Sequence, residues 1–136
     1  MRVTPDTNVL ARTLVDDSGA LAQCIAAREA LGAASEIFVP QVVQIELCWV
    51  LASAFGLRHA EILTVLKVLV VNPRVELDQR DKFEATLERF AANPASTFAD
   101  CLIVTVAEQR ESALLTFDKK LARQAGVTVL AGIAQR

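Results

Sequence analysis

Residues 2–15 read RVTPDTNVLARTLV, a stretch in which a short extended segment runs directly into a helical pattern. Residues 2–4 are predicted to form a strand that ends at Pro5, and residues 9–15 are predicted to form a helix. The junction between the two consists of Asp6, Thr7 and Asn8. Side chains of these types cap helices, so the chain is expected to pass from strand to helix without an intervening loop.

The rest of the chain repeats this alternation. Further strands are predicted at Ile37–Val39, Val75–Leu77, Ala113–Thr116 and Val127–Leu130. Further helices are predicted from Ser18 to Gly32, Gln41 to Phe55, His59 to about Val70, Asp78 to Asn93, Thr97 or Ser96 to about Arg110, and Asp118 to Gly126. Five strands that alternate with about seven helices, with no hairpin signal between strands, indicate an α/β fold around a mostly parallel sheet.

Length and composition limit the classes of protein to consider. The 136 residues predict a single domain over residues 1–136, and 53% apolar residues exclude a disordered chain. The net charge of −2 gives no general attraction to nucleic acid or membranes, and a sequence without tyrosine disfavours a base-stacking platform. The N-terminus lacks a signal-peptide pattern and no apolar run is long enough to span a bilayer, so we expect a cytoplasmic protein.

Several common kinds of site are disfavoured by what the sequence lacks. The three cysteines, Cys24, Cys48 and Cys101, lie in apolar stretches without CxxC spacing, which predicts reduced interior thiols rather than a zinc site. The one histidine, His59, is expected at the surface, which weakens histidine-based acid–base schemes. No nucleophile elbow and no glycine-rich phosphate loop is present.

Four carboxylates remain as candidates for chemistry: Asp6, Glu46, Asp100 and Asp118. Each has an ordinary explanation, since Asp6 and Asp118 can be helix caps, Asp100 a first-turn acid and Glu46 a solvent-facing residue. Binding crevices in parallel α/β sheets lie beyond the carboxyl ends of the strands, where Asp6 and Asp118 are predicted. Carboxylates that converge there would repel one another unless a divalent cation lay between them, and oxygen ligands suit Mg²⁺ or Mn²⁺.

The ordered motifs of the chain resemble those of the PIN-domain nucleases. The motifs are DTNVLAR at 6–12, PQVVQIELCWVL at 40–51, FADCLIVTVAE at 98–108 and LLTFDKKLA at 114–122. Within that family the chain most resembles the VapC toxins of bacterial and archaeal toxin–antitoxin pairs. The resemblance implies a PIN-like fold with a central five-stranded parallel sheet. It also implies an acidic quartet of Asp6, Glu46, Asp100 and Asp118 that binds Mg²⁺ or Mn²⁺, supported by Asn8 and Thr116, with Thr7 shaping the turn.

The same resemblance implies an activity and partners. The expected activity is metal-dependent endoribonuclease cleavage of RNA, and the expected partners are a second copy of the chain and a VapB-type antitoxin, in a heterotetramer or a larger assembly. Basic residues near the motifs are candidates for RNA phosphate contacts: Arg12, Lys119, Lys120 and Arg123. Two positions depart from the family pattern. Pro5 is expected to shorten the first strand, and Thr97 replaces an additional acid that some relatives carry.

Three alternatives remain open at this stage. A receiver-type phosphoacceptor domain also combines clustered acids with Mg²⁺, but it needs an acid pair after the first strand and a lysine after the last strand. A PIN domain without catalytic activity would act as a binding module, and a metal-dependent nuclease assay separates it from an enzyme. A phosphatase with a DxD motif is disfavoured because Asn8 replaces the second acid.

Overall fold

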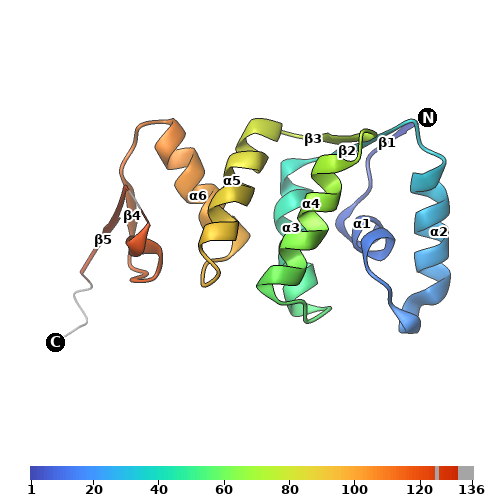
Figure 1. The fold of residues 1–136 in the computed structure, drawn as a ribbon, viewed down its shortest axis with the longest axis horizontal. Coiled ribbons are helices and arrows are strands. Elements are labelled where there is room, and N and C mark those ends of the chain that lie inside the picture. Colours follow the sequence, from blue (N-terminus) through green and yellow to red (C-terminus); the bar gives the residue numbers. More distant parts are fainter. Residues whose placement is uncertain (125, 132–136) are drawn as a thin grey trace. The chain divides into compact units, whose positions relative to one another are not determined.

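The computed structural model describes residues 1–124 and 126–131 of the 136-residue chain. The chain forms two compact units, Met1–Arg80 and Asp81–Arg136, and each is described by itself. Figure 1 shows their elements in sequence order. Among the described residues, no helix is both long enough and apolar enough to cross a membrane.

The first unit contains a three-stranded parallel sheet (Figure 1). Its strands are β1 (Arg2–Val3), β2 (Glu36–Val39) and β3 (Val75–Leu77), in the order β1-β2-β3. In the register of the sheet, Val3 lies beside Ile37, which lies beside Val75. Because the strands are parallel, their carboxyl ends share one edge, and the chain leaves that edge at Asp6 after β1 and at Pro40 after β2.

In this unit two α-helices follow β1 and two follow β2. They are α1 (Thr7–Leu14), the 3₁₀ turn η1 (Ser18–Ala20), α2 (Leu21–Gly32), α3 (Gln41–Ser53) and α4 (His59–Val71). The core is apolar, and its fully buried side chains include Leu10, Leu47 and Leu66. The α3 helix ends before Gly56, whose φ of 64° is a conformation that glycine adopts without strain.

Two polar side chains join the elements of the first unit. Asp78, which follows β3, accepts a hydrogen bond from the backbone N–H of Gln41 at 3.1 Å and so caps α3. The following helix, predicted to start at Asp78, begins at Arg80, and Gln79, with a φ of 52°, lies between the two residues. The Arg74 guanidinium donates to three backbone carbonyl oxygens at the end of α2, those of Leu31, Gly32 and Ala34, at 2.8–3.2 Å.

The second unit is built on a cluster of aromatic rings and a two-stranded parallel sheet. Its elements are α5 (Arg80–Ala92), which begins at the last residue of the first unit, α6 (Phe98–Gln109), β4 (Leu114–Thr116), the 3₁₀ turn η2 (Leu121–Arg123) and β5 (Val127–Val129). The Phe98 ring packs against Phe83 and Phe90, with ring centroids 5.6 and 5.9 Å apart. This packing joins α5 to the start of α6.

The α/β class and the parallel strands are confirmed, but the expected single five-stranded sheet is wrong. The described residues form five strands in two sheets, with six α-helices and two 3₁₀ turns. Periodicity predicts where short strands occur, whereas pairing depends on long-range contacts that local sequence does not encode. The helix expected from Asp118 to Gly126 is also wrong, since the described residues of that segment, 118–124 and 126, contain the three-residue turn η2 and no α-helix.

Candidate functional site

Asp6 lies directly after the first strand and caps α1. Its Oδ1 accepts a hydrogen bond from the backbone N–H of Val9 at 3.0 Å, and the residue is exposed. The strand before it, β1, ends at Val3, one residue earlier than predicted, and Pro5 is buried. A carboxylate has about four lone-pair sites, so this cap leaves further sites for a ligand.

Glu46 is brought to the start of α1 by a side-chain hydrogen bond. The hydroxyl Oγ1 of Thr7 donates to Oε1 of Glu46 at 3.1 Å, across 39 positions of sequence. Thr7 is only 9% exposed, whereas Glu46 is exposed on α3. Because Asp6 precedes Thr7 in the chain, this bond places Glu46 next to the residue that follows Asp6. Sequence reasoning gave Thr7 only the role of shaping a turn and missed this contact.

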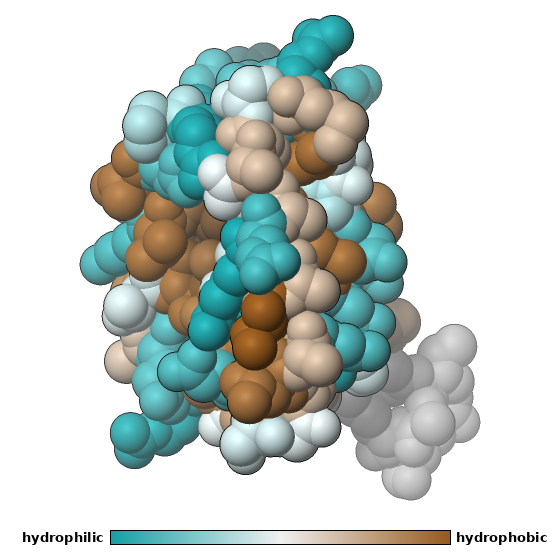
Figure 2. All heavy atoms as spheres, turned by 90° about the vertical axis from the view of Figure 1, so that its right-hand side faces the viewer, coloured by the Kyte–Doolittle hydropathy of each residue, from teal (hydrophilic) through white to brown (hydrophobic). Residues whose placement is uncertain are grey.

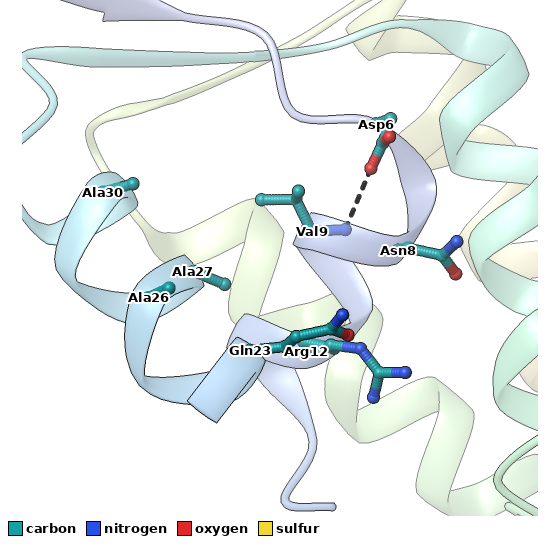
Figure 3. Close-up of a pocket in the computed structure, with 8 residues that line it drawn as sticks. All are labelled: Asp6, Asn8, Val9, Arg12, Gln23, Ala26, Ala27 and Ala30. Atoms are coloured by element: carbon teal, nitrogen blue, oxygen red, sulfur yellow. Dashed lines mark hydrogen bonds between the residues drawn. The ribbon is translucent and has the colours of Figure 1, made fainter. Parts of the chain in front are cut away.

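A hollow lies between α1 and α2, with Asp6 among the residues that form its wall (Figure 3). Its volume is about 420 Å³, and its lining residues are Asp6, Asn8, Val9, Arg12, Gln23, Ala26, Ala27 and Ala30. The Arg12 guanidinium, predicted to contact RNA phosphate, pairs with Asp17 at 2.9 Å and is partly exposed. The ion pair with Asp17 therefore neutralises part of the positive charge that Arg12 brings to the hollow. Gln23 was not among the predicted site residues.

Asp100 lies in the first turn of α6. Thr97 is the N-cap of that helix, and its hydroxyl accepts a hydrogen bond from the backbone N–H of Asp100 at 3.1 Å. Thr97 therefore accepts a hydrogen bond from the backbone of Asp100 and supplies no carboxylate of its own. Asp100 is partly exposed, and the rest of α6 buries Cys101 and Leu102 directly after it.

Asp118 lies in the loop after β4 and organises that loop through its own carboxylate. Its Oδ1 accepts hydrogen bonds from the backbone N–H groups of Lys120 at 2.8 Å and Leu121 at 3.4 Å. Its own N–H donates to the Thr116 hydroxyl at 3.0 Å, so Thr116 acts on the backbone of Asp118. The basic residues of this segment, predicted to contact phosphate, reach solvent: Lys119 and Lys120 are exposed and Arg123 is at least partly so.

Comparison with protein families decides what kind of domain carries these four carboxylates. The family model described as "PIN domain" matches residues 3–127, a range that contains all four. The chain belongs to the PIN domain family. PIN domains are typically nucleases, which are hydrolases, and they typically use Mg²⁺ or Mn²⁺. The comparison with curated proteins finds no significant match.

The donor atoms of this PIN domain suit a hard divalent cation. All four carboxylates are exposed or partly exposed, and oxygen ligands of this type favour Mg²⁺ or Mn²⁺. Within the described residues, however, no group of three or more His, Cys, Asp or Glu side chains is arranged to hold a metal ion. The first unit carries Asp6 and Glu46, and the second carries Asp100 and Asp118.

The thiols next to two of these carboxylates are unreactive. Burial raises the pKa of Cys48, which follows Glu46 by two residues, to about 12. Burial also raises the pKa of Cys101 to about 11; the charge of Arg89 opposes this increase, and the neighbouring Asp100 adds to it. Both thiols are therefore neutral near pH 7 and are not nucleophiles. The prediction that the three cysteines are unpaired interior thiols is confirmed.

Proposed function

We propose that this PIN domain is a Mg²⁺- or Mn²⁺-dependent endoribonuclease that hydrolyses RNA phosphodiester bonds. The observation that carries the proposal is the family match over residues 3–127, which includes four carboxylates that all reach solvent. Phosphodiester hydrolysis needs an activated water and compensation of charge on the phosphoryl oxygens, and the chain offers carboxylates rather than histidine for both tasks. The family match disfavours the receiver-type alternative.

The four carboxylates are the ligands that the family resemblance implies. Asp6, Glu46, Asp100 and Asp118 would hold the metal, directly or through water. When bound, the metal lowers the pKa of a water molecule and neutralises charge on the phosphate. Thr7 holds the Glu46 carboxylate through its hydroxyl, while Asn8 supports the first unit's part of the site. Thr116 supports Asp118 in the second unit.

RNA binding is assigned to basic and amide groups that reach solvent. The cations Lys119, Lys120 and Arg123 follow Asp118 within five residues and are suited to RNA phosphates. The hollow beside Asp6 offers Arg12 and Gln23 to a strand that passes the first unit. Since few aromatic side chains are available for stacking, these polar contacts favour selection by RNA shape or by a short sequence at the cleavage point.

We further propose that the domain acts in the cytoplasm as a VapC-type toxin, paired with itself and with a VapB-type antitoxin in a heterotetramer or a larger assembly. Exposed apolar side chains on two helices support protein partners: Val42 and Trp49 on α3 are 60% and 71% exposed, and Val68 and Val71 on α4 are 47% and 76% exposed. Figure 2 shows hydrophobic patches between hydrophilic ones on the face of the first unit that carries α2. Surfaces of this kind mark interaction sites in many proteins.

The proposal is tested by brief induction of the wild-type chain and of Asp6→Asn, with and without a co-expressed antitoxin, followed by sequencing of RNA 5′ ends. New 5′ ends are expected only with the wild-type chain in the absence of antitoxin, and they would also identify the target RNA. Equal cleavage by Asp6→Asn would contradict the assignment. Metal-independent RNA binding without any cleavage would instead identify a PIN binding module.

A further inference from the structure

Two carboxylate-bearing segments of the second unit are joined by a partly buried side-chain hydrogen bond. Asp100 lies in the first turn of α6 and Asp118 in the loop after β4. The side-chain amide Nε2 of Gln124 donates to the hydroxyl Oγ of Ser96 at 3.1 Å, across 28 positions of sequence. Gln124 is 7% exposed and Ser96 is partly exposed, so the amide end of the bond is the end that is shielded from water.

The Gln124 end of this bond is attached to Asp118 by consecutive turns. The carboxylate of Asp118 accepts from two backbone N–H groups, and its carbonyl oxygen accepts from the N–H of Ala122 at 3.1 Å. The N–H of Gln124 then donates to the carbonyl of Leu121 at 3.1 Å, and the Leu121 side chain is buried. These bonds hold Gln124 at a constant position relative to Asp118.

The Ser96 end is attached to Asp100 in a similar way. The N–H of Ser96 donates to the carbonyl of Asn93 at 3.0 Å, which closes the turn before α6. The next residue, Thr97, accepts the N–H of Asp100 with its hydroxyl and the N–H of Cys101 with its carbonyl. A displacement of Ser96 is thus transmitted to the first turn of the helix that carries Asp100.

The chemistry of Gln124 is unfavourable for a purely structural role. Its Oε1 is buried and has no hydrogen-bond partner among the residues that the structure describes. A buried acceptor without a partner costs stability, and an apolar side chain of the same length would avoid that cost. The amide is useful where the distance between two segments must be kept constant, because a hydrogen bond specifies geometry more narrowly than apolar packing does.

We propose that Gln124 is a positioning residue, whose hydrogen bond to Ser96 sets the separation of the Asp100 and Asp118 carboxylates in the metal-dependent site. This inference rests on the proposed function. Gln124 and Ser96 themselves contact neither metal nor RNA in this scheme. Removal of a hydrogen bond to a ligating side chain typically changes metal affinity by about 10–100-fold, and a bond one contact further out should have an effect at the low end of that range.

The test measures Mn²⁺ binding by electron paramagnetic resonance, together with thermal unfolding, in Gln124→Met, Ser96→Ala and the double variant. Each single variant is expected to raise the Mn²⁺ dissociation constant by about tenfold. The Mn²⁺ dissociation constant of the double variant should not exceed the larger of the two single-variant values, because both substitutions remove the same bond. The matched control Gln109→Met alters an exposed glutamine at the end of α6 and should bind Mn²⁺ as the wild-type chain does.

The outcomes separate this inference from the function on which it rests. If the wild-type chain binds Mn²⁺ and Asp100→Asn does not, but the Gln124 and Ser96 variants bind like the wild type, the positioning role is wrong and the function stands. A lower Tm with unchanged Mn²⁺ affinity in the folded protein also rejects the positioning role alone. If the wild-type chain itself binds no Mn²⁺, both proposals fail. Should Gln124→Met not fold, Ser96→Ala decides the question alone.

Discussion

The two units differ in how one acidic side chain is held, since Asp6 in the first unit accepts a local cap bond as Asp118 does in the second, whereas Glu46 does not. In the first unit a side-chain contact spans a long stretch of sequence, from the Thr7 hydroxyl to the Glu46 carboxylate. In the second unit Asp100 and Asp118 are each placed by bonds within their own segment, and Gln124 joins the two segments. A carboxylate placed by local bonds keeps its position when distant parts of the chain change, whereas Glu46 depends on the packing of α1 and α3.

The largest expected effect tests whether the two acidic pairs serve one reaction. Asp6→Asn and Asp118→Asn keep an oxygen that can accept the capping hydrogen bond, so the fold should be retained. Each is expected to lower metal-stimulated RNA cleavage by at least about 100-fold, because one ligand for the cation and its charge are lost. Cleavage rates and circular dichroism spectra check this.

The double variant Asp6→Asn with Asp118→Asn then sharpens the comparison. If both pairs act together in one reaction, the double variant should cleave RNA only slightly more slowly than either single variant. The control Asp81→Asn alters an exposed acid in the first turn of α5 and should cleave normally. Normal cleavage by either single variant would contradict the hypothesis that both acidic pairs are needed for the same reaction.

A smaller effect is expected from the hydroxyl groups that support the carboxylates. Thr7→Val removes the donor to Glu46, and Mn²⁺ affinity measured by titration should fall by about tenfold. Thr116→Val removes an acceptor for the backbone N–H of Asp118, whose carboxylate remains held by two other bonds, so its effect should be smaller. Thr128→Val, on exposed β5, is the control. Equal effects at Thr7 and Thr116 would contradict the distinction between the units.

One buried thiol in each unit, Cys48 and Cys101, has a raised pKa, and each predicts how the free energy of unfolding depends on pH. Burial raises the pKa of Cys48 and Cys101 from 9.0 to about 12 and about 11 in the folded state. Above pH 9 the unfolded chain ionises first, so each thiol lowers the free energy of unfolding as the pH rises, until its folded pKa is reached. The contribution is fully present below pH 9.

Urea unfolding between pH 8 and pH 11 measures this slope, and the chain has no tyrosine to titrate in the same range. Cys48→Ala and Cys101→Ala should each remove part of the slope, although both lower stability at pH 7 through loss of packing. An unchanged slope in both variants would show that these thiols are accessible to water in the native state.

The smallest effect concerns a carboxylate that serves only as a cap. In α4 the pKa of Glu61 is lowered, chiefly by the hydrogen bond that its side chain accepts from the backbone N–H of Arg58. Its contribution to stability is therefore present above pH 4.5 and is lost as the pH falls through the lower folded pKa. Glu61→Gln should lower the Tm at pH 7 by a few degrees at most, with no change in Mn²⁺ binding. A change in Mn²⁺ affinity would contradict its assignment as a cap.

The features that could be predicted from sequence are those set by nearby residues. The caps of the first helix were predicted among Asp6, Thr7 and Asn8, and Asp6 is the N-cap of α1. A helix was predicted to begin at Thr97 or Ser96, and Thr97 is the N-cap of α6. The interior thiols were predicted from their apolar neighbours. The strands were located to within about a residue; the first two runs end at Pro5 and Pro40, and the third begins after Asn72 and Pro73.

The features that could not be predicted depend on distant residues. Nothing near Asp78 indicates that it caps α3, because the N–H that it accepts belongs to Gln41. Glu46 is exposed, as its interpretation as a solvent-facing residue expected, but the hydrogen bond that it accepts from Thr7 had no signal in the nearby sequence. The bond of Gln124 to Ser96 gives no local signal either, since a lone glutamine in a loop resembles any surface residue.

The contact of Arg74 with the end of α2 has a practical consequence for engineering. One guanidinium nitrogen donates to the carbonyl groups of Leu31, Gly32 and Ala34, so the segment 31–34 would tolerate insertions or circular permutation poorly. New termini or a fused reporter are better placed at the turn around Ala54, where the chain is exposed and carries no such clamp among the described residues. A split version of the protein divided there would carry Arg74 and its three acceptors on different fragments, so the same contact would help the fragments to reassemble.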